Sequence, residues 1–356
     1  MVALEEKIKA IEKEIRETPY HKATEHHIGR LRAKLAKLRE MYEAPPKAKG
    51  PKAGFAVKKT GDATVVLVGP PSVGKSSLLN QLTRAFSKVG EYDFTTLEVV
   101  PGILEYKGAK IQILDIPGLL GRAAKGRGRG QKILSVARQA DLLILMVDIK
   151  AADKIDQIQN ELYEAGVRLN QEPPQVKIKK LPKGGLRVIS PTKDTSETVK
   201  TIAKEFGLIN AEIVVKKAST LEEMIDAFAS NRVYLPALTL INKIDLLKNE
   251  EIEGLKKKGR LLISAQKGVG LDQLKAEIFQ KLDFIQVFLK PKNREPDFDR
   301  PLILKRGTTV SEAIKKVSEE VLKNSKFARV WGASVKFPGQ QVSLSHQLVD
   351  GDLLFF

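Results

Sequence analysis

The chain of 356 residues contains no cysteine, one tryptophan and four histidines. The absence of cysteine excludes disulfides, thiolate metal sites, iron–sulfur clusters and cysteine nucleophiles. Three histidines (positions 21, 26 and 27) lie near the start of a predicted helix, and the fourth, at position 346, is distant in the sequence. This spacing does not predict a metal site, and we expect structural or surface roles for these side chains.

Long hydrophobic runs are also missing. The apolar stretch Leu142–Val147 is bounded by Asp141 and Asp148, and it is far shorter than the roughly 20 residues that cross a bilayer. The N-terminal residues alternate charged and aliphatic side chains and lack the continuous apolar core of a signal peptide. We therefore expect a cytoplasmic protein without a membrane partner.

Acidic residues are in deficit, with 43 Asp+Glu against 61 Lys+Arg and a formal net charge of +18. This excess favours association with polyanions such as RNA, and non-specific basicity is the alternative. At this length, with 42% hydrophobic residues, the chain can form about two to four domains, each with its own core.

The N-terminal residues 1–44 predict two helices that fold back as an antiparallel hairpin. Each helix carries one apolar stripe at helical spacing. The stripes are Leu4, Ile8, Ile11, Ile15 and then Ile28, Leu31, Leu35, Leu38, Tyr42. Residues 45–61, rich in proline, glycine and lysine, predict a basic linker.

Short aliphatic runs follow from residue 62, and they predict the buried strands of a parallel sheet. The runs are 64–68, 110–114, 142–147, 238–241 and 261–263. We expect a doubly wound α/β domain over residues 62–168 and 235–290, interrupted by a small α+β domain at 169–234. In this insert, residues 175–190 predict a hairpin, 197–206 a helix and 211–215 a strand. Residues 291–356 predict a β-grasp module with one helix, 310–322.

A glycine-rich segment lies between the first predicted strand and a helix that we expect to start at Ser76, the context of a phosphate-binding loop. Gly69 and Gly74 permit the tight backbone whose amides face phosphates. Lys75 is expected to bridge the β- and γ-phosphates, and Ser76 to bind Mg²⁺. The predicted phosphate-binding residues are Gly69, Pro70, Pro71, Ser72, Val73, Gly74, Lys75, Ser76 and Ser77.

Asn242-Lys243-Ile244-Asp245 follows another predicted strand and favours guanine. Asp245 can accept hydrogen bonds from the guanine N1–H and exocyclic amine, a donor pair that adenine lacks. The backbone amides of Ser264, Ala265 and Gln266 are expected to face the guanine O6. GTP is therefore predicted, and an ATPase is the disfavoured alternative.

Asp115-Ile116-Pro117-Gly118 ends the strand predicted at 110–114. We expect Asp115 to reach Mg²⁺ through water, the Gly118 amide to reach the γ-phosphate and the Thr96 hydroxyl to complete the metal coordination. Thr95 is the neighbour most easily confused with Thr96. The predicted catalytic residues are Lys75, Thr96 and Gly118, and the predicted metal residues are Ser76, Thr96 and Asp115.

Several segments resemble those of a known family. Phe94-Thr95-Thr96-Leu97, Val100-Pro101-Gly102 and the run 126–130 are similar to Obg-related GTPases. Residues 22–29, together with the helix 31–38, resemble the developmentally regulated GTP-binding proteins. Residues 328–332 and 348–352 resemble a TGS domain. The resemblance covers essentially the whole chain, and it implies an inserted domain similar to one in translational proteins and an association with ribosomes.

Two departures bear on hydrolysis. Leu119 stands where many signalling GTPases have a glutamine that orients the attacking water, so we expect slow intrinsic hydrolysis. The acceleration would come from a monovalent cation, a loop residue or the ribosome. Ser72 stands where potassium-dependent relatives often have asparagine. Mg²⁺ is therefore the expected cofactor, and the sequence leaves open whether K⁺ is a second one.

A basic, glycine-rich segment follows Gly118, and its cations are RNA-contact candidates: Arg122, Lys125, Arg127, Arg129 and Lys132. A solvated switch loop is the alternative, and an arginine acting on the γ-phosphate is a third hypothesis. Trp331, the single tryptophan, favours a core position over a base-stacking one.

The sequence thus predicts a GTP-hydrolysing switch that acts on ribosomes or ribosome-associated RNA in translation. The expected partners are GTP or GDP, the ribosome or its rRNA and tRNA, and a dedicated regulatory protein as a further candidate; no DNA specificity is expected. The alternative is a non-catalytic RNA-binding scaffold that GTP stabilises without being hydrolysed.

Overall fold

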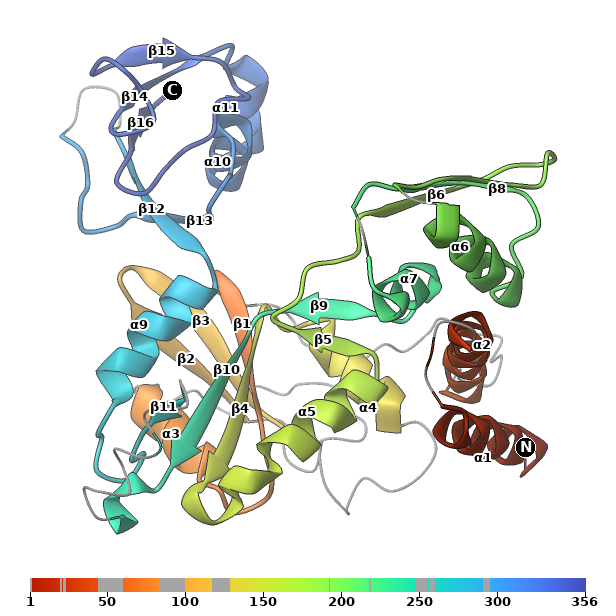
Figure 1. Cartoon of the computed structure of the whole chain (residues 1–356). Helices are drawn as coiled ribbons and strands as arrows, with labels where there is room; N and C mark the ends of the chain where they lie inside the picture. The colour runs from red at the N-terminus through yellow and green to blue at the C-terminus, as the bar shows by residue number, and fades with distance from the viewer. Residues whose placement is uncertain are drawn as a thin grey trace, which may run out of the picture. The chain divides into compact units, whose positions relative to one another are not determined.

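A computed structural model describes residues 2–19, 21, 24–43, 60–83, 100–116, 129–191, 193–217, 219–247, 255, 260–290 and 295–356 (Figure 1). The chain forms two compact units. The smaller unit combines the N-terminal helices with residues 122–138 and 159–235. The larger unit contains a central β-sheet and the C-terminal module. Within the described residues, no helix has the length and apolar character needed to span a membrane.

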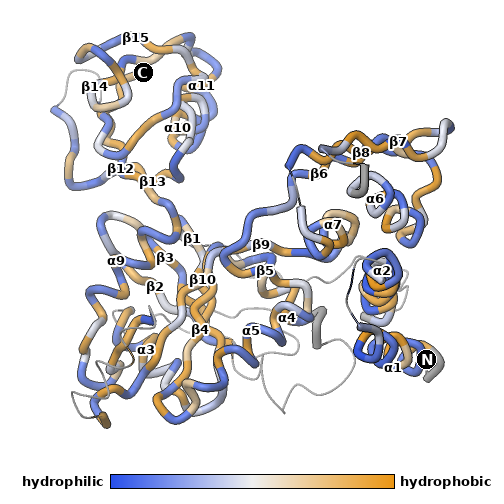
Figure 2. The backbone as a smooth tube through the Cα atoms, viewed as in Figure 1, coloured by the Kyte–Doolittle hydropathy of each residue, from blue (hydrophilic) through white to orange (hydrophobic). Residues whose placement is uncertain are grey.

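The larger unit is built on a six-stranded sheet of order β11-β10-β4-β1-β3-β2. Its strands are β1 (Ala63–Val68), β2 (Val100–Tyr106), β3 (Ala109–Asp115), β4 (Leu142–Asp148), β10 (Ala237–Asn242) and β11 (Leu261–Leu262). All neighbours pair in parallel except β2 and β3. Every residue of β1 is buried, as expected for a strand covered on both faces. These central strands are therefore continuously hydrophobic (Figure 2), and the predicted α/β class is confirmed.

Helices and short 3₁₀ turns follow the strands of this sheet along the chain. They are α3 (Lys75–Leu82), η2 (Ile149–Lys154), α5 (Ile155–Glu164), η3 (Ile244–Leu246) and α9 (Leu271–Lys281). The apolar side chains of α3 and α9 belong to the same core as those of β1, β3 and β4. The loops at the carboxyl ends of β1, β3 and β10 carry the predicted nucleotide residues. These strands are parallel, so their carboxyl ends, and therefore the three loops, lie at the same edge of the sheet.

The C-terminal module has its own five-stranded sheet, of order β13-β12-β16-β14-β15. Its elements are β12 (Phe284–Leu289), β13 (Leu302–Lys305), α10 (Val310–Val317), α11 (Glu319–Asn324), β14 (Ala328–Trp331), β15 (Gln340–Val342) and β16 (Leu353–Phe355). The module starts at β12, so the predicted boundary after residue 290 is too late. The apolar run 284–289 pairs with β13 and β16 instead of ending the preceding domain.

The single helix expected at 310–322 is also wrong. Ser318 has an extended backbone with φ of −162° and separates α10 from α11. Its hydroxyl accepts a hydrogen bond from the Val321 amide at 3.4 Å, which caps the second helix. The amphipathic spacing continues across the break, so periodicity alone did not detect it.

The smaller unit contains α1 (Val2–Glu17), α2 (Glu25–Glu43), α4 (Arg129–Ala137), the end of α5, α6 (Lys193–Glu205) and α7 (Leu221–Phe228). Its strands are β5 (Val167–Leu169) paired with β9 (Val233–Leu235), and β6 (Val176–Lys180), β7 (Leu186–Ile189) and β8 (Ala211–Val215). Ile11 of α1 and Ile28 of α2 are buried, in line with the predicted apolar stripes. Ala33 of α2 is fully buried in the core of the inserted sheet, a contact that the predicted hairpin did not include.

The hairpin predicted at 175–190 does not form. The sheet order is β6-β8-β7, with β8 antiparallel to β6 and parallel to β7. Strand β8 alternates buried and half-buried residues, whereas β6 and β7 have no buried residue. The more apolar strand therefore takes the central position, and the two lysine- and arginine-bearing strands become edges.

Candidate functional site

The phosphate-binding loop connects the end of β1 to the start of α3, which begins at Lys75, one residue before the predicted start. Two glycines of this loop are required by close contacts, and the second is required by its backbone conformation as well. A Cβ on Gly69 would lie 2.0 Å from the Met146 carbonyl oxygen. Gly74 has φ of +95°, and its Cβ would lie 2.5 Å from the Asn242 Nδ2. The loop therefore fits closely against β4 and the residue that ends β10.

Lys75 folds back over this loop. Its Nζ donates to the carbonyl oxygens of Gly69 at 3.1 Å and Pro70 at 2.9 Å. Burial lowers the pKa of the Lys75 ammonium, and the nearby Asp115 carboxylate opposes that shift. The ammonium is held by neutral carbonyls, which phosphate oxygens can replace with stronger charge-assisted hydrogen bonds.

Ser76 and Asp115 meet where the loop faces the end of β3. The Ser76 hydroxyl donates to the Asp115 Oδ2 at 2.7 Å. The other carboxylate oxygen, Oδ1, is buried and has no hydrogen-bond partner within the described residues. A hydroxyl beside a carboxylate supplies the hard oxygen atoms that Mg²⁺ prefers, so these two side chains fit the predicted metal.

Asn242, the last residue of β10, forms hydrogen bonds both to the phosphate-binding loop and to the loop that contains Ser264 and Ala265, the second segment predicted to bind guanine. Its Nδ2 donates to the Val73 carbonyl at 2.9 Å, and its Oδ1 accepts from the Ala265 amide at 2.9 Å. Asn242 is buried, so its primary role is to fix the relative positions of three loops. This positioning role was not part of the sequence prediction, which grouped Asn242 with the base-binding residues.

Lys243 lies across the same loop with φ of 66°. Its Nζ donates to the Ser72 carbonyl at 2.7 Å and pairs with Asp148 at 3.0 Å. The Asp148 contact was also missed, because it joins β4 to a residue that follows β10. The only feature of the sequence that could have indicated this contact is that Asp148 and Lys243 each lie at the end of a predicted parallel strand.

The proposed base-recognition carboxylate, Asp245, stands in η3. Its Oδ1 accepts a hydrogen bond from the Ser264 hydroxyl at 2.5 Å, and this bond lowers the pKa of Asp245. Ser264 is fully buried and follows β11. The structure thus brings the two guanine-side segments together and keeps the carboxylate in the ionised form that accepts hydrogen bonds.

Several predicted residues lie outside the described part of the chain: Thr96, Pro117, Gly118, Leu119, Arg122, Lys125 and Arg127. Arg129 begins α4, but its side chain is not described, and Lys132 is an exposed residue of the same helix. Ile116 is buried after β3, whereas Pro71, Ser72 and Gln266 are exposed on their loops and Ser77 is exposed in the first turn of α3. The roles assigned to all of these residues stay predictions.

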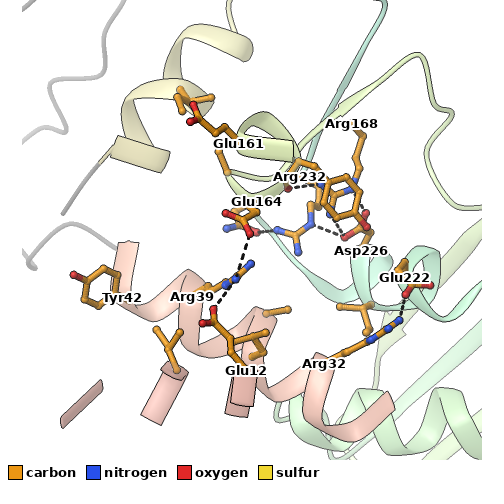
Figure 3. A pocket seen from close by; sticks show the side chains of 18 of the residues that line it. Glu12, Arg32, Arg39, Tyr42, Glu161, Glu164, Arg168, Glu222, Asp226 and Arg232 are labelled. Atoms are coloured by element: carbon orange, nitrogen blue, oxygen red, sulfur yellow. Dashed lines mark hydrogen bonds and ion pairs between the residues drawn. The ribbon is translucent and has the colours of Figure 1, made fainter. Parts of the chain in front are cut away.

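A second polar site lies within the smaller unit, in a pocket of about 730 Å³ lined by α1, α2, α5 and α7 (Figure 3). At its base Asp226 accepts hydrogen bonds from two arginines, Arg168 and Arg232. The Arg168 guanidinium also stacks over the Tyr163 ring, 3.6 Å from its centroid. Sequence reasoning missed this cluster, because Arg168 of β5, Asp226 of α7 and Arg232 before β9 are isolated charges that lie far apart in the chain.

The fold and the loops at one edge of its sheet define a P-loop GTPase domain followed by a β-grasp module. Family models agree: one described as a 50S ribosome-binding GTPase matches residues 64–180, one for the C-terminal region of that domain matches 183–284, and a TGS-domain model matches 285–355. The chain belongs to the developmentally regulated GTP-binding protein family.

Relatives match over nearly the full length. A GTP-binding protein of Methanocaldococcus jannaschii is 50% identical over 99% of this chain and 93% of its own length. Developmentally-regulated G-protein 3 of Arabidopsis thaliana is 42% identical over 99% of this chain and 98% of its own. Developmentally-regulated GTP-binding protein 1 of Xenopus laevis is 40% identical, covering 98% and 97%. The family resemblance and the TGS domain predicted from the sequence are thus confirmed.

Proposed function

We propose that this protein hydrolyses GTP with Mg²⁺ and works as a nucleotide-dependent switch on ribosomes or ribosome-associated RNA. The observation that carries the catalytic part is the pairing of Ser76 with Asp115, which leaves the Asp115 Oδ1 buried and without a partner in the described residues. An unpaired buried carboxylate oxygen is costly, and a metal-bound water would satisfy it.

Ser76 would hold the metal directly and Asp115 through water, with Thr96 as the predicted third residue. When bound, Mg²⁺ neutralises charge on the β- and γ-phosphate oxygens. Lys75, released from the two carbonyls that it now contacts, would bind those phosphates, and the Gly118 amide is the predicted donor to the γ-phosphate. Asp245 and the amides near Ala265 would select guanine.

Slow intrinsic turnover belongs to this proposal, because Leu119 cannot orient the attacking water as a glutamine does. Potassium is a proposed second cofactor. Ser72 has φ of 63°, in the left-handed region that asparagine adopts readily, so the loop can accommodate Ser72→Asn. That variant tests whether an amide at this position increases the response to K⁺.

Two observations support the ribosome as partner. The formal charge of +18 favours binding to a polyanion, and the matching family model is described as a ribosome-binding GTPase. Contacts with rRNA or tRNA through the cations between Arg122 and Lys132, and a cytoplasmic site of action, are part of the same proposal.

The test is single-turnover hydrolysis of GTP, with and without ribosomes from the source organism, in potassium and in sodium buffer. We expect slow hydrolysis alone and strong acceleration by ribosomes, and Lys75→Met is expected to abolish both. Tight GTP binding without hydrolysis under every condition would instead support the alternative, a scaffold that GTP only stabilises.

A further inference from the structure

The face of the C-terminal sheet away from α10 and α11 carries a group of partly exposed aromatic side chains, and Gly339 lies against the ring of one of them, Trp331. Alternate residues of the strands point to opposite faces. Val330 of β14 and Leu354 of β16 are buried in the module's core, with α10 and α11 packed on that side. Trp331 and Phe355 alternate with these core residues and so lie on the opposite face, where both are partly exposed. Trp331 therefore does not occupy the core position predicted from the sequence.

Strand register aligns this face into two rows. Phe288 pairs with Leu353, and Leu353 pairs with Trp331, which makes one row across β12, β16 and β14. Arg329 pairs with Phe355 on one side and Gln341 on the other, which makes a second row. Three aromatic rings and an exposed guanidinium therefore share one sheet face.

Neighbouring residues extend the same chemistry. Phe298 is 62% exposed, and its ring centroid lies 5.1 Å from that of Phe288. The Lys290 ammonium lies 5.2 Å from the centre of the Trp331 ring. The five strands contain no aspartate or glutamate.

We propose that this aromatic face, defined as Phe288, Arg329, Trp331 and Phe355, binds single-stranded RNA by stacking its bases. Unpaired bases stack on aromatic rings exposed on a sheet, and neighbouring cations contact their phosphates. A duplex hides its bases and cannot stack in this way. The inference rests on the proposed RNA partner and names both the surface and the form of RNA that it takes.

Trp331 is the only tryptophan in the chain, so its fluorescence reports on this face alone. The full-length protein, bound to GDP, is titrated with single-stranded octamers of uridine and of adenosine. We expect saturable quenching by both. A duplex of the same length and inorganic polyphosphate should quench much less, because neither offers a free base.

Variants then locate the binding, measured by the anisotropy of a labelled octamer. Trp331→Leu and Phe355→Leu keep apolar bulk but remove a ring, and each should weaken binding by about tenfold. Arg329→Gln should weaken it by a few-fold. Lys323→Gln, on exposed α11, removes the same charge away from this face and should leave binding within about twofold. Thermal melting of each variant checks that the module still folds.

Absence of quenching by single strands overturns the inference, as does equal quenching by duplex RNA or polyphosphate, which would indicate charge alone. A change in fluorescence with ribosomal proteins but not with RNA would assign this face to a protein partner and also overturn it. Ribosome-stimulated hydrolysis that persists in Trp331→Leu, together with no RNA quenching, would reject the aromatic face while leaving the proposed switch intact.

Discussion

Two polar regions of this protein pair their charges in different ways. At the nucleotide site, within the part of the chain that the structure describes, Lys75 donates hydrogen bonds only to backbone carbonyls and Asp115 has one carboxylate oxygen without a partner. In the smaller unit, Asp226 accepts from the Arg168 Nη2 at 2.8 Å and from the Arg232 Nε at 2.5 Å. The first region keeps polar atoms available for a ligand, whereas the second pairs its charges internally.

This difference separates a binding site from a structural cluster, although both contain buried charges. Arg168 also donates to the Tyr163 carbonyl at 2.7 Å, so the guanidinium is held from several sides. The nearby Tyr234 hydroxyl is buried, and this burial together with Asp226 raises its pKa to about 12, which keeps the phenol neutral. A charged group in a pocket is therefore a weak indication of function unless it also lacks partners.

The largest expected effect comes from Asp226→Asn. It leaves two arginines without their shared carboxylate, and we expect a loss of about 3–5 kcal/mol in the free energy of unfolding with little change in GTP affinity. Urea unfolding and nucleotide titration measure the two quantities. Glu164→Gln, a 65% exposed carboxylate of the same pocket, should cost less than about 1 kcal/mol. A large drop in GTP affinity for Asp226→Asn would show that the cluster is not merely structural.

Lys75→Met should weaken GTP binding by about a hundredfold, because in the proposed site the ammonium is the charged donor to the phosphates. Titration with a fluorescent GTP analogue measures the change. Lys110→Met, which removes an exposed lysine from β3, is the matched control and should bind normally. Equal affinities for the two variants would contradict the role assigned to Lys75.

Asp245→Asn should change which base is bound. In the proposed role, the carboxylate accepts two hydrogen bonds from guanine, whereas an amide can donate to the C2 carbonyl of xanthine. We expect GTP affinity to fall by about ten- to a hundredfold and xanthosine triphosphate to compete better than GTP. A competition assay between GTP and xanthosine triphosphate measures the relative affinities. An unchanged preference for GTP would show that Asp245 does not recognise the base.

The smallest effect is expected for Ser264→Ala. The serine hydroxyl is the main cause of the lowered pKa of Asp245. Because only the ionised carboxylate can accept at both oxygens, we expect GDP affinity to fall as the pH falls through that pKa. Removing the hydroxyl raises the pKa, so the acid limb of the affinity profile should move to higher pH. At neutral pH the affinity should fall only about threefold; an unmoved acid limb would argue against this coupling.

Local patterns predicted most of the nucleotide site. The positive φ of Gly74 is a local backbone requirement, and Asp115, Asn242 and Ser264 follow strands whose ends meet at one edge of a parallel sheet. The sequence could not show that the Asn242 side chain would hold two other loops. That role depends on the approach of Val73 and Ala265, which are far from Asn242 in the chain.

The sequence by itself determined the α/β class, the phosphate loop and the family, because periodicity, strand-end residues and glycine positions are properties of short segments. Only the tertiary structure decided that β8 separates β6 from β7, that Ala33 joins the core of the inserted sheet and that Trp331 faces outward. These outcomes depend on which apolar surfaces cover one another, and such long-range packing is not encoded in any local spacing.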